Sequence, residues 1–171
     1  PFTELEITRG RSLSAKFIQR EVELVRSLAL PHQKLLLTNA ITLPDAQLAD
    51  DDRAFEASLK LADAIGFNIY TKVPHGATSN YLEAQPSYWQ KLATWQTILG
   101  QQGKESWIAE AQAEPWEPNE LVPVKQIDYP SSSPSQAATL VDTVQTIGFN
   151  PILLWGCEYW YWHLKQGRDQ W

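Results

Sequence analysis

The chain has 171 residues, 43% of them hydrophobic and 20% charged, and a formal net charge of −6. These proportions are typical of a globular chain with a core, and the lack of any long apolar run excludes a membrane-spanning helix in this segment. An acidic chain without a basic stripe is also a poor candidate for binding nucleic acid.

Few residues suit disulfide or metal chemistry. The single cysteine, Cys157, excludes an internal disulfide, and the three histidines His32, His75 and His163 lack metal-ligand spacing. We therefore expect neither a metal nor a cofactor. The chain starts at Pro1 and contains no Met, so we expect an internal or C-terminal piece of a longer protein, whose localisation the sequence does not indicate.

The aromatic content is the unusual feature of the composition, with eight Trp and six Tyr residues. Trp is costly to bury completely, and a surplus often lines a surface or a cleft, where indole rings can stack on the apolar faces of sugars. A core rich in Trp is the alternative interpretation.

The first part of the chain predicts two helices and two strands. Apolar residues at helical spacing predict a helix over 12–28, and a short apolar run predicts a buried strand over 34–39. The acidic run 50–52 is expected to cap a second helix that ends at Gly66, and a second strand follows over 67–72.

The second part repeats this alternation. A capping box over 87–90 predicts a helix that stops around Gly100 to Gly103, followed by a strand over 106–110 and a long Pro-rich loop over 114–134. Ser133–Gln136 is a second capping box with Pro134 at the first helical position. The helix it opens is expected to end at Gly148, before a strand over 151–155 and a last helix in the tail 159–171.

The four residues Ile-Gly-Phe-Asn occur twice, at 65–68 and at 147–150. Each copy lies where a predicted helix gives way to a strand. We interpret Gly66 and Gly148 as left-handed helix ends.

Strands that alternate with helices predict an α/β fold with a parallel sheet and helical crossovers. The pattern alone leaves open whether the sheet is doubly wound or closed into a barrel. No Gly-rich phosphate loop follows any strand, so a nucleotide-binding function is disfavoured.

The carboxyl ends of parallel strands meet at one edge of the sheet, where sites form in such folds. The side chains expected there are Asn39; Asn68 and Tyr70; Glu110, Gln112, Glu114 and Trp116; and Trp155, Glu158 and Trp160. Carboxylates and aromatic rings suit the hydrolysis of glycosidic bonds. Each carboxylate could instead be a solvated strand end, and each ring could be packing.

The segment 107–116, Trp-Ile-Ala-Glu-Ala-Gln-Ala-Glu-Pro-Trp, resembles the seventh-strand segment of clan A glycoside hydrolases, which include the family 5 cellulase-like enzymes. Glu110 matches their nucleophile. The segment 67–70 resembles their sixth strand, whose tyrosine matches Tyr70, and 152–155 resembles their eighth strand, whose tryptophan matches Trp155.

The resemblance implies that 1–171 is one partial domain, the C-terminal half of a (β/α)8 barrel containing strands five to eight. It implies retaining hydrolysis of β-glycosidic bonds, with Glu110 as nucleophile, Tyr70 supporting it, and the remaining strand-end residues binding carbohydrate. The family's proton donor is a Glu after an Asn at the end of strand four. No Asn-Glu pair precedes Ser12, and Asn119-Glu120 lies after the nucleophile.

The implied partners are therefore a carbohydrate substrate and a missing N-terminal half-barrel. Without the donor, this chain alone is expected to hydrolyse unactivated glycosides very poorly. One alternative is a non-catalytic carbohydrate-binding relative. Another alternative is an unrelated α/β protein in which Glu110 has no catalytic role. A Glu110 carboxylate that lies far from Tyr70 and Trp155 would favour this alternative.

Overall fold

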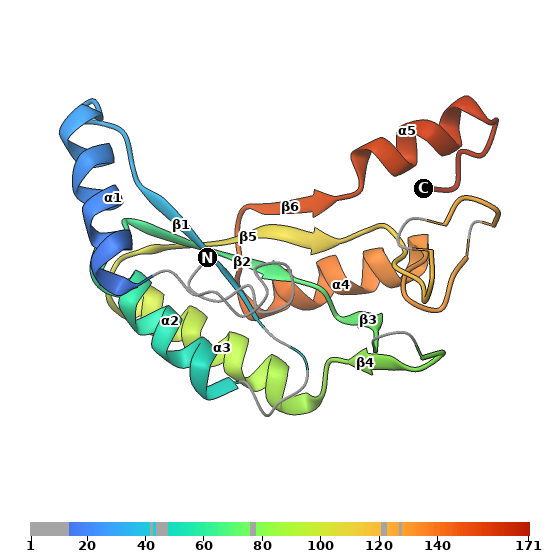
Figure 1. The fold of residues 1–171 in the computed structure, drawn as a ribbon, viewed down its shortest axis with the longest axis horizontal. Helices are drawn as coiled ribbons and strands as arrows, with labels where there is room; N and C mark the ends of the chain where they lie inside the picture. Colours follow the sequence, from blue (N-terminus) through green and yellow to red (C-terminus); the bar gives the residue numbers. More distant parts are fainter. Residues whose placement is uncertain (1–13, 42, 44–47, 76–77, 121–122, 127) are drawn as a thin grey trace.

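The computed structural model describes residues 14–41, 43, 48–75, 78–120, 123–126 and 128–171. Its centre is a four-stranded sheet in which all neighbouring strands are parallel (Figure 1). In spatial order the strands are β1 (Leu36–Ala40), β2 (Ala64–Ile69), β5 (Glu105–Gln112) and β6 (Ile152–Trp155). The predicted α/β class with a parallel sheet is confirmed.

Helices alternate with these strands along the chain. They are α1 (Ala15–Leu28), α2 (Leu48–Leu61), α3 (Pro86–Gln101), α4 (Pro134–Ile147) and α5 (Cys157–Lys165). A short antiparallel hairpin, β3 (Lys72–Pro74) with β4 (Tyr81–Glu83), stands apart from the main sheet. The sequence pattern missed this hairpin: the predicted strand 67–72 merged the end of β2 with the start of β3.

The core fills the space between one face of the sheet and the helices α2, α3 and α4, which all lie on that face (Figure 1). Alternate residues of β2 point into it, since Ile65, Phe67 and Ile69 are fully buried. The Phe67 ring packs against Trp95 of α3, with ring centroids 5.4 Å apart, and against Phe149 at 5.6 Å. The apolar face of each of these helices therefore packs against the sheet.

On the opposite face of the sheet, Gly66 lies close to side chains of both neighbouring strands. A Cβ on Gly66 would lie 2.7 Å from the Cβ of Ala109 and 3.5 Å from side-chain atoms of Leu36 and Thr38. Gly66 is thus an interior residue of β2 that lets two strands approach, and the prediction that it ends a helix is wrong. Gly148 does end α4 in the left-handed region, with φ of 109°, as predicted.

Two predicted helix starts also differ. The helix α2 begins at Leu48, so the acidic run lies inside the helix, where Asp52 accepts a hydrogen bond from Trp95 Nε1 at 3.2 Å and pairs with Lys91. The helix α3 begins one residue earlier than the predicted box, at Pro86, with Gln85 as an N-cap that makes no side-chain capping bond. The capping box at Ser133 is confirmed, since its side chain accepts from the Gln136 amide.

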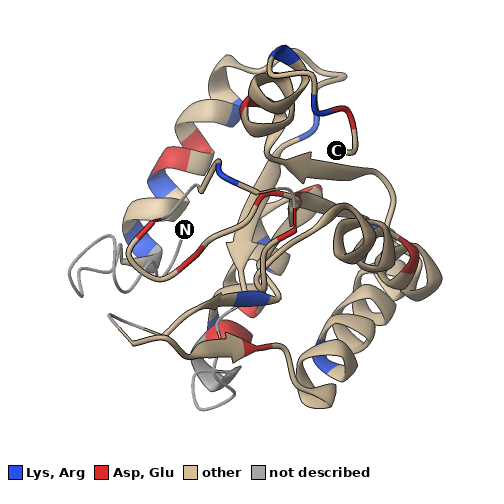
Figure 2. Ribbon diagram, turned by 90° about the vertical axis from the view of Figure 1, so that its right-hand side faces the viewer, with Lys and Arg blue, Asp and Glu red and all other residues tan. Residues whose placement is uncertain are grey.

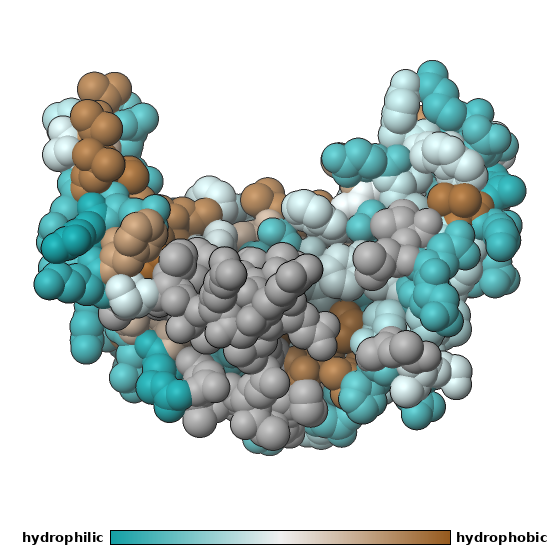
Figure 3. Space-filling model, viewed as in Figure 1, coloured by the Kyte–Doolittle hydropathy of each residue, from teal (hydrophilic) through white to brown (hydrophobic). Residues whose placement is uncertain are grey.

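Several large apolar side chains are exposed near the two edge strands of the sheet, β1 and β6. Phe17, Leu24 and Leu28 are exposed on α1, beyond β1. Figure 3 shows a brown band along this helix, flanked by hydrophilic side chains in teal. At the other end Leu153, Leu154 and Trp155 of β6 are exposed, together with Tyr161 and Leu164 of α5. Among the described residues, no helix is both long and apolar enough to cross a membrane.

His163, on α5, is fully buried, and neither of its ring nitrogens has a hydrogen-bond partner in the described structure. Its ring packs against those of Tyr159 and Trp162. Burial lowers the pKa of His163, and the positive charge of Arg168 lowers it further. The folded protein therefore holds this imidazole in its neutral form.

This burial predicts a loss of stability in mild acid. As pH falls below about 6.5, His163 gains a proton in the unfolded chain before it does so in the folded one, which favours unfolding. Between pH 7.5 and 5, the His163→Phe variant should lose less in melting temperature than the parent chain. The exposed His32 gives a matched control, and a loss in His163→Phe equal to that in His32→Phe would contradict the prediction.

Candidate functional site

The central feature of the site is a bulge in β5 that turns the Glu110 side chain away from the helices. Phe67 of β2 is in register with Ile108, whereas the next residue, Asn68, is in register with Glu110, so Ala109 is an extra residue. Ile108 and Ala111 both point into the core. Glu110 therefore lies on the opposite face, beside Asn68. Bulges of this kind are common next to active sites, where they re-aim a side chain.

Tyr70 holds the carboxylate of Glu110 at this position. Its hydroxyl donates a hydrogen bond of 2.7 Å to Glu110 Oε2. Burial raises the pKa of Tyr70, and the hydrogen bond to Glu110 raises it further. The hydroxyl thus keeps its proton and acts as a permanent donor to the carboxylate.

Trp116 and Glu114 form a second layer around Tyr70. The rings of Tyr70 and Trp116 stack with centroids 4.4 Å apart. The indole of Trp116 donates to Glu114 Oε1 at 3.1 Å, and its backbone amide donates to Ser131 Oγ at 2.8 Å. Glu114 is buried just beyond the end of β5. These contacts fix the orientation of the tyrosine ring that reaches Glu110.

Gln112 joins the end of β5 to the segment that follows β2. Its side-chain oxygen accepts hydrogen bonds from the backbone amides of Thr71 and Lys72, at 2.9 and 3.1 Å. Its side-chain nitrogen donates to the carbonyl of Lys72 at 2.8 Å. The Gln112 side chain therefore ties β5 to this segment through two accepted bonds and one donated bond, and its predicted role in ligand binding stays a prediction.

Trp155 lies at the carboxyl end of β6, in register with Gln112. It is therefore on the same side of the sheet as Glu110, and 47% of its surface is exposed. The next residue, Gly156, has φ of 136°, and a Cβ there would lie 2.9 Å from the carbonyl oxygen of Ala113. A glycine is required at this position, which lets β6 close against the end of β5.

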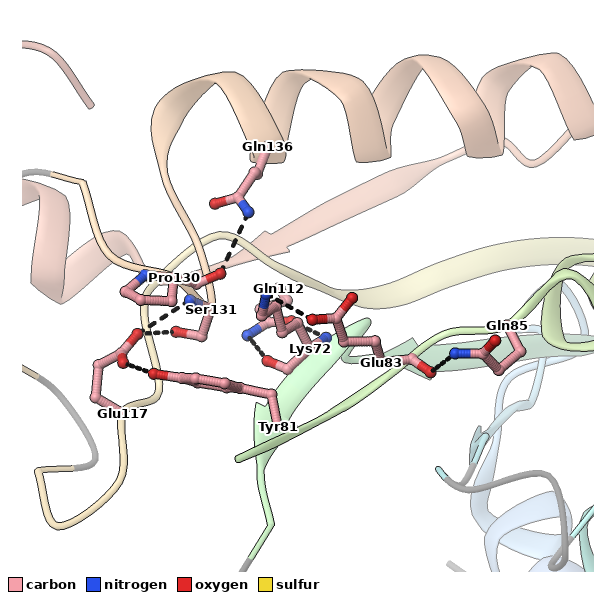
Figure 4. Close-up of polar contacts among 9 residues, drawn as sticks. All are labelled: Lys72, Tyr81, Glu83, Gln85, Gln112, Glu117, Pro130, Ser131 and Gln136. Atoms are coloured by element: carbon pink, nitrogen blue, oxygen red, sulfur yellow. Dashed lines mark hydrogen bonds and ion pairs between the residues drawn. The ribbon is translucent and has the colours of Figure 1, made fainter. Parts of the chain in front are cut away.

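A further polar network ties the loop after β5 to the hairpin β3–β4 (Figure 4). Glu117 Oε1 accepts hydrogen bonds from the amide and the hydroxyl of Ser131, at 3.0 and 2.6 Å. Glu117 Oε2 accepts from the hydroxyl of Tyr81 on β4. These residues were not among the predicted site residues, and the signal in the sequence that pointed to them was the length of the loop 114–134.

Three predicted site residues lie elsewhere. Asn39 is buried on the helix side of the sheet, where its Oδ1 accepts a hydrogen bond from Ser58 of α2. Trp160 donates to the carbonyl of Ala113 and lines an apolar groove beside α4. Glu158 is exposed on α5, where the hydrogen bond from the Cys157 thiol lowers the pKa of Glu158. The structure thus brings together Asn68, Tyr70, Glu110, Glu114, Trp116 and Trp155 at one edge of the sheet.

The described Lys and Arg residues do not gather on one element. They are scattered over helices, loops and the hairpin in Figure 2. The described part of the chain contains no group of three His, Cys, Asp or Glu side chains placed to hold a metal ion. The site consists of carboxylates, a protonated tyrosine and indole rings.

Comparison with known proteins gives no family for the chain: no family model, no curated protein and no solved structure matches it. Its chemistry is therefore inferred from the site itself.

Proposed function

We propose that this chain is the half of a (β/α)8-barrel glycoside hydrolase that contains strands five to eight, and that Glu110 is the nucleophile of a retaining mechanism. The observation that carries the proposal is the 2.7 Å hydrogen bond from Tyr70 to Glu110, at the carboxyl edge of a parallel sheet. The proposed substrate is an oligo- or polysaccharide with β-glycosidic bonds.

The order of the strands agrees with the proposed half-barrel. In a doubly wound fold the strand order reverses partway and helices cover both faces. Here β1, β2, β5 and β6 are added in one direction, and α2, α3 and α4 lie on one face. The apolar side chains exposed on α1 and β6 are those that a second set of strands and helices would cover.

In the proposed mechanism, Glu110 attacks the anomeric carbon and displaces the leaving group, forming a glycosyl-enzyme ester that water then hydrolyses. Tyr70 holds the attacking carboxylate, and Trp116 holds Tyr70. Trp155, half exposed on the same side of the sheet, is placed to stack on the sugar ring.

The proposal assigns proton donation to a residue on the other half of the barrel. In retaining enzymes the two carboxyl groups lie roughly 5–5.5 Å apart. Glu114 is buried and bonded to Trp116, so we assign it a positioning role. General acid catalysis contributes roughly 10²–10⁴-fold, so efficient hydrolysis of unactivated glycosides requires both halves.

Labelling with 2-deoxy-2-fluoro β-glycosides that carry an activated leaving group tests the proposal. Such reagents need little acid assistance, so they can be used on this chain and on the chain joined to the proposed N-terminal half. Peptide mass mapping is expected to find the fluorosugar on Glu110. The Glu110→Gln variant should remain unlabelled, and Glu114→Gln should still react.

The other outcomes separate the alternatives. An adduct on Glu114 or Glu158 would keep the reaction class and refute Glu110 as nucleophile. A folded two-half protein that no member of a sugar panel labels would support a non-catalytic carbohydrate-binding relative instead.

A further inference from the structure

A pocket of about 350 Å³ lies on another part of the molecule, between the hairpin, α3 and α4. We call it the α4 pocket. Its lining residues include Lys72 and Glu83 from the hairpin, Trp89 from α3, and Gln136, Thr139 and Thr143 from α4. It contains none of Tyr70, Glu110 and Trp116, and its volume is within the range of roughly 300–1,000 Å³ typical of small-molecule sites.

The wall formed by α4 offers hydrogen-bond acceptors. The hydroxyls of Thr139 and Thr143 donate to the helix carbonyls of Ser135 and Thr139, at 2.9 and 2.7 Å, which leaves only their lone pairs for a ligand. Gln136 donates one N–H of Nε2 to the carbonyl of Pro130 at 3.3 Å, which leaves its amide oxygen and one N–H. Acceptors therefore outnumber donors on this wall, so a ligand that supplies several donors fits it best.

The opposite wall carries one positive and one negative group that already compensate each other. Lys72 Nζ lies 2.6 Å from Glu83 Oε1 and also sits over the ring of Tyr81. Figure 4 shows Gln136 pointing from α4 toward the hairpin, and Glu83 pointing from the hairpin toward α4. The half-buried indole of Trp89 adds an apolar surface between these walls.

From this geometry we propose that the α4 pocket binds a neutral polyhydroxy compound of the size of a monosaccharide, as a site separate from Glu110. Sugar hydroxyls supply donors for the acceptors of the α4 wall, and they can also accept from Lys72 and Gln136 and donate to Glu83. The apolar face of a sugar ring can lie against Trp89. Inorganic phosphate has fewer hydroxyl donors than a sugar and no apolar face to lie against Trp89, and the paired Lys72 and Glu83 present no net charge to an ion.

Ser131 connects this pocket to the site at Glu110. It lines the pocket, is only 4% exposed, and accepts the hydrogen bond from the amide of Trp116. The proposal nevertheless goes beyond hydrolysis, because no residue proposed for bond cleavage lines the pocket.

The test is an NMR titration of the Glu110→Gln chain with methyl β-glucoside, methyl mannoside and methyl β-xyloside, one at a time. At least one sugar is expected to shift the Trp89 indole signal and the amides of 136–143. Thr139→Val keeps the side-chain shape and removes one acceptor, so it should weaken binding about fivefold or more. Thr97→Val is the matched control, because Thr97 makes the same bond to a helix carbonyl on α3, outside the pocket.

Two results would overturn the proposal. One is that no sugar shifts the signals of the Trp89 indole and the amides of 136–143, whether or not inorganic phosphate or tetramethylammonium shifts them. The other is equal weakening by Thr139→Val and Thr97→Val. Because labelling of Glu110 is measured separately, failure of either test leaves the other inference intact.

Discussion

If the proposed function holds, replacing Glu110 with Gln is expected to lower kcat for an activated aryl β-glycoside by at least about 10³-fold, measured with the proposed N-terminal half present. The amide has nearly the same shape as the carboxylate but cannot form the glycosyl ester. Glu120, exposed in the loop after β5, provides a matched control, and Glu120→Gln should retain the parent rate.

The Tyr70→Phe variant distinguishes the two roles at this site. It removes the hydroxyl that holds Glu110 and leaves the ring that stacks on Trp116. Hydrogen bonds to charged groups contribute about 1.5–3 kcal/mol, so kcat should fall roughly 10–10²-fold, less than in Glu110→Gln. Unchanged turnover in Glu110→Gln would refute the proposed nucleophile.

The largest expected effect on stability is that of Phe67→Ala. Phe67 is 0% exposed and packs against rings from α2, α3 and the segment before β6, namely Phe55, Trp95 and Phe149. Truncating it leaves a cavity at the point where three elements meet, and should reduce the free energy of unfolding by about 3–5 kcal/mol. Urea denaturation followed by Trp fluorescence measures this change.

Phe17 gives a control of identical chemistry, because its side chain is 46% exposed on α1. Phe17→Ala should change the free energy of unfolding by under about 1 kcal/mol. Similar losses in the two variants would mean that the core does not lie where the sheet meets α2, α3 and α4.

The regular elements were predictable because their signals are local. Apolar spacing predicted the helices and the four parallel strands, and the Ser133 capping box and Gly148 correctly marked both ends of α4. Gly66 misled the prediction, because glycine both ends helices and permits close strand contact. Gly66 permits close strand contact because Ala109 packs against it, and Ala109 is 43 positions away in the sequence, so no local pattern reveals this role.

The site was partly predictable for a related reason. Strand ends identified Tyr70, Glu110 and Trp155, since parallel strands share one edge. Alternation cannot show on which face a strand-end residue lies when a bulge is present, and the β5 bulge decides this for Glu110. Asn39, on regular β1, faces Ser58 instead. The Tyr81–Glu117–Ser131 contacts depend on how the long loop after β5 folds, and no local pattern in the sequence predicts this.

The three hydrogen bonds of Gln112 have a consequence for motion at this edge. One side chain pairs with both amides and a carbonyl of Thr71 and Lys72, much as an added strand would. Separating the segment after β2 from β5 would break all three bonds together. We therefore expect Tyr70 and Glu110 to keep their relative positions when a ligand approaches this edge.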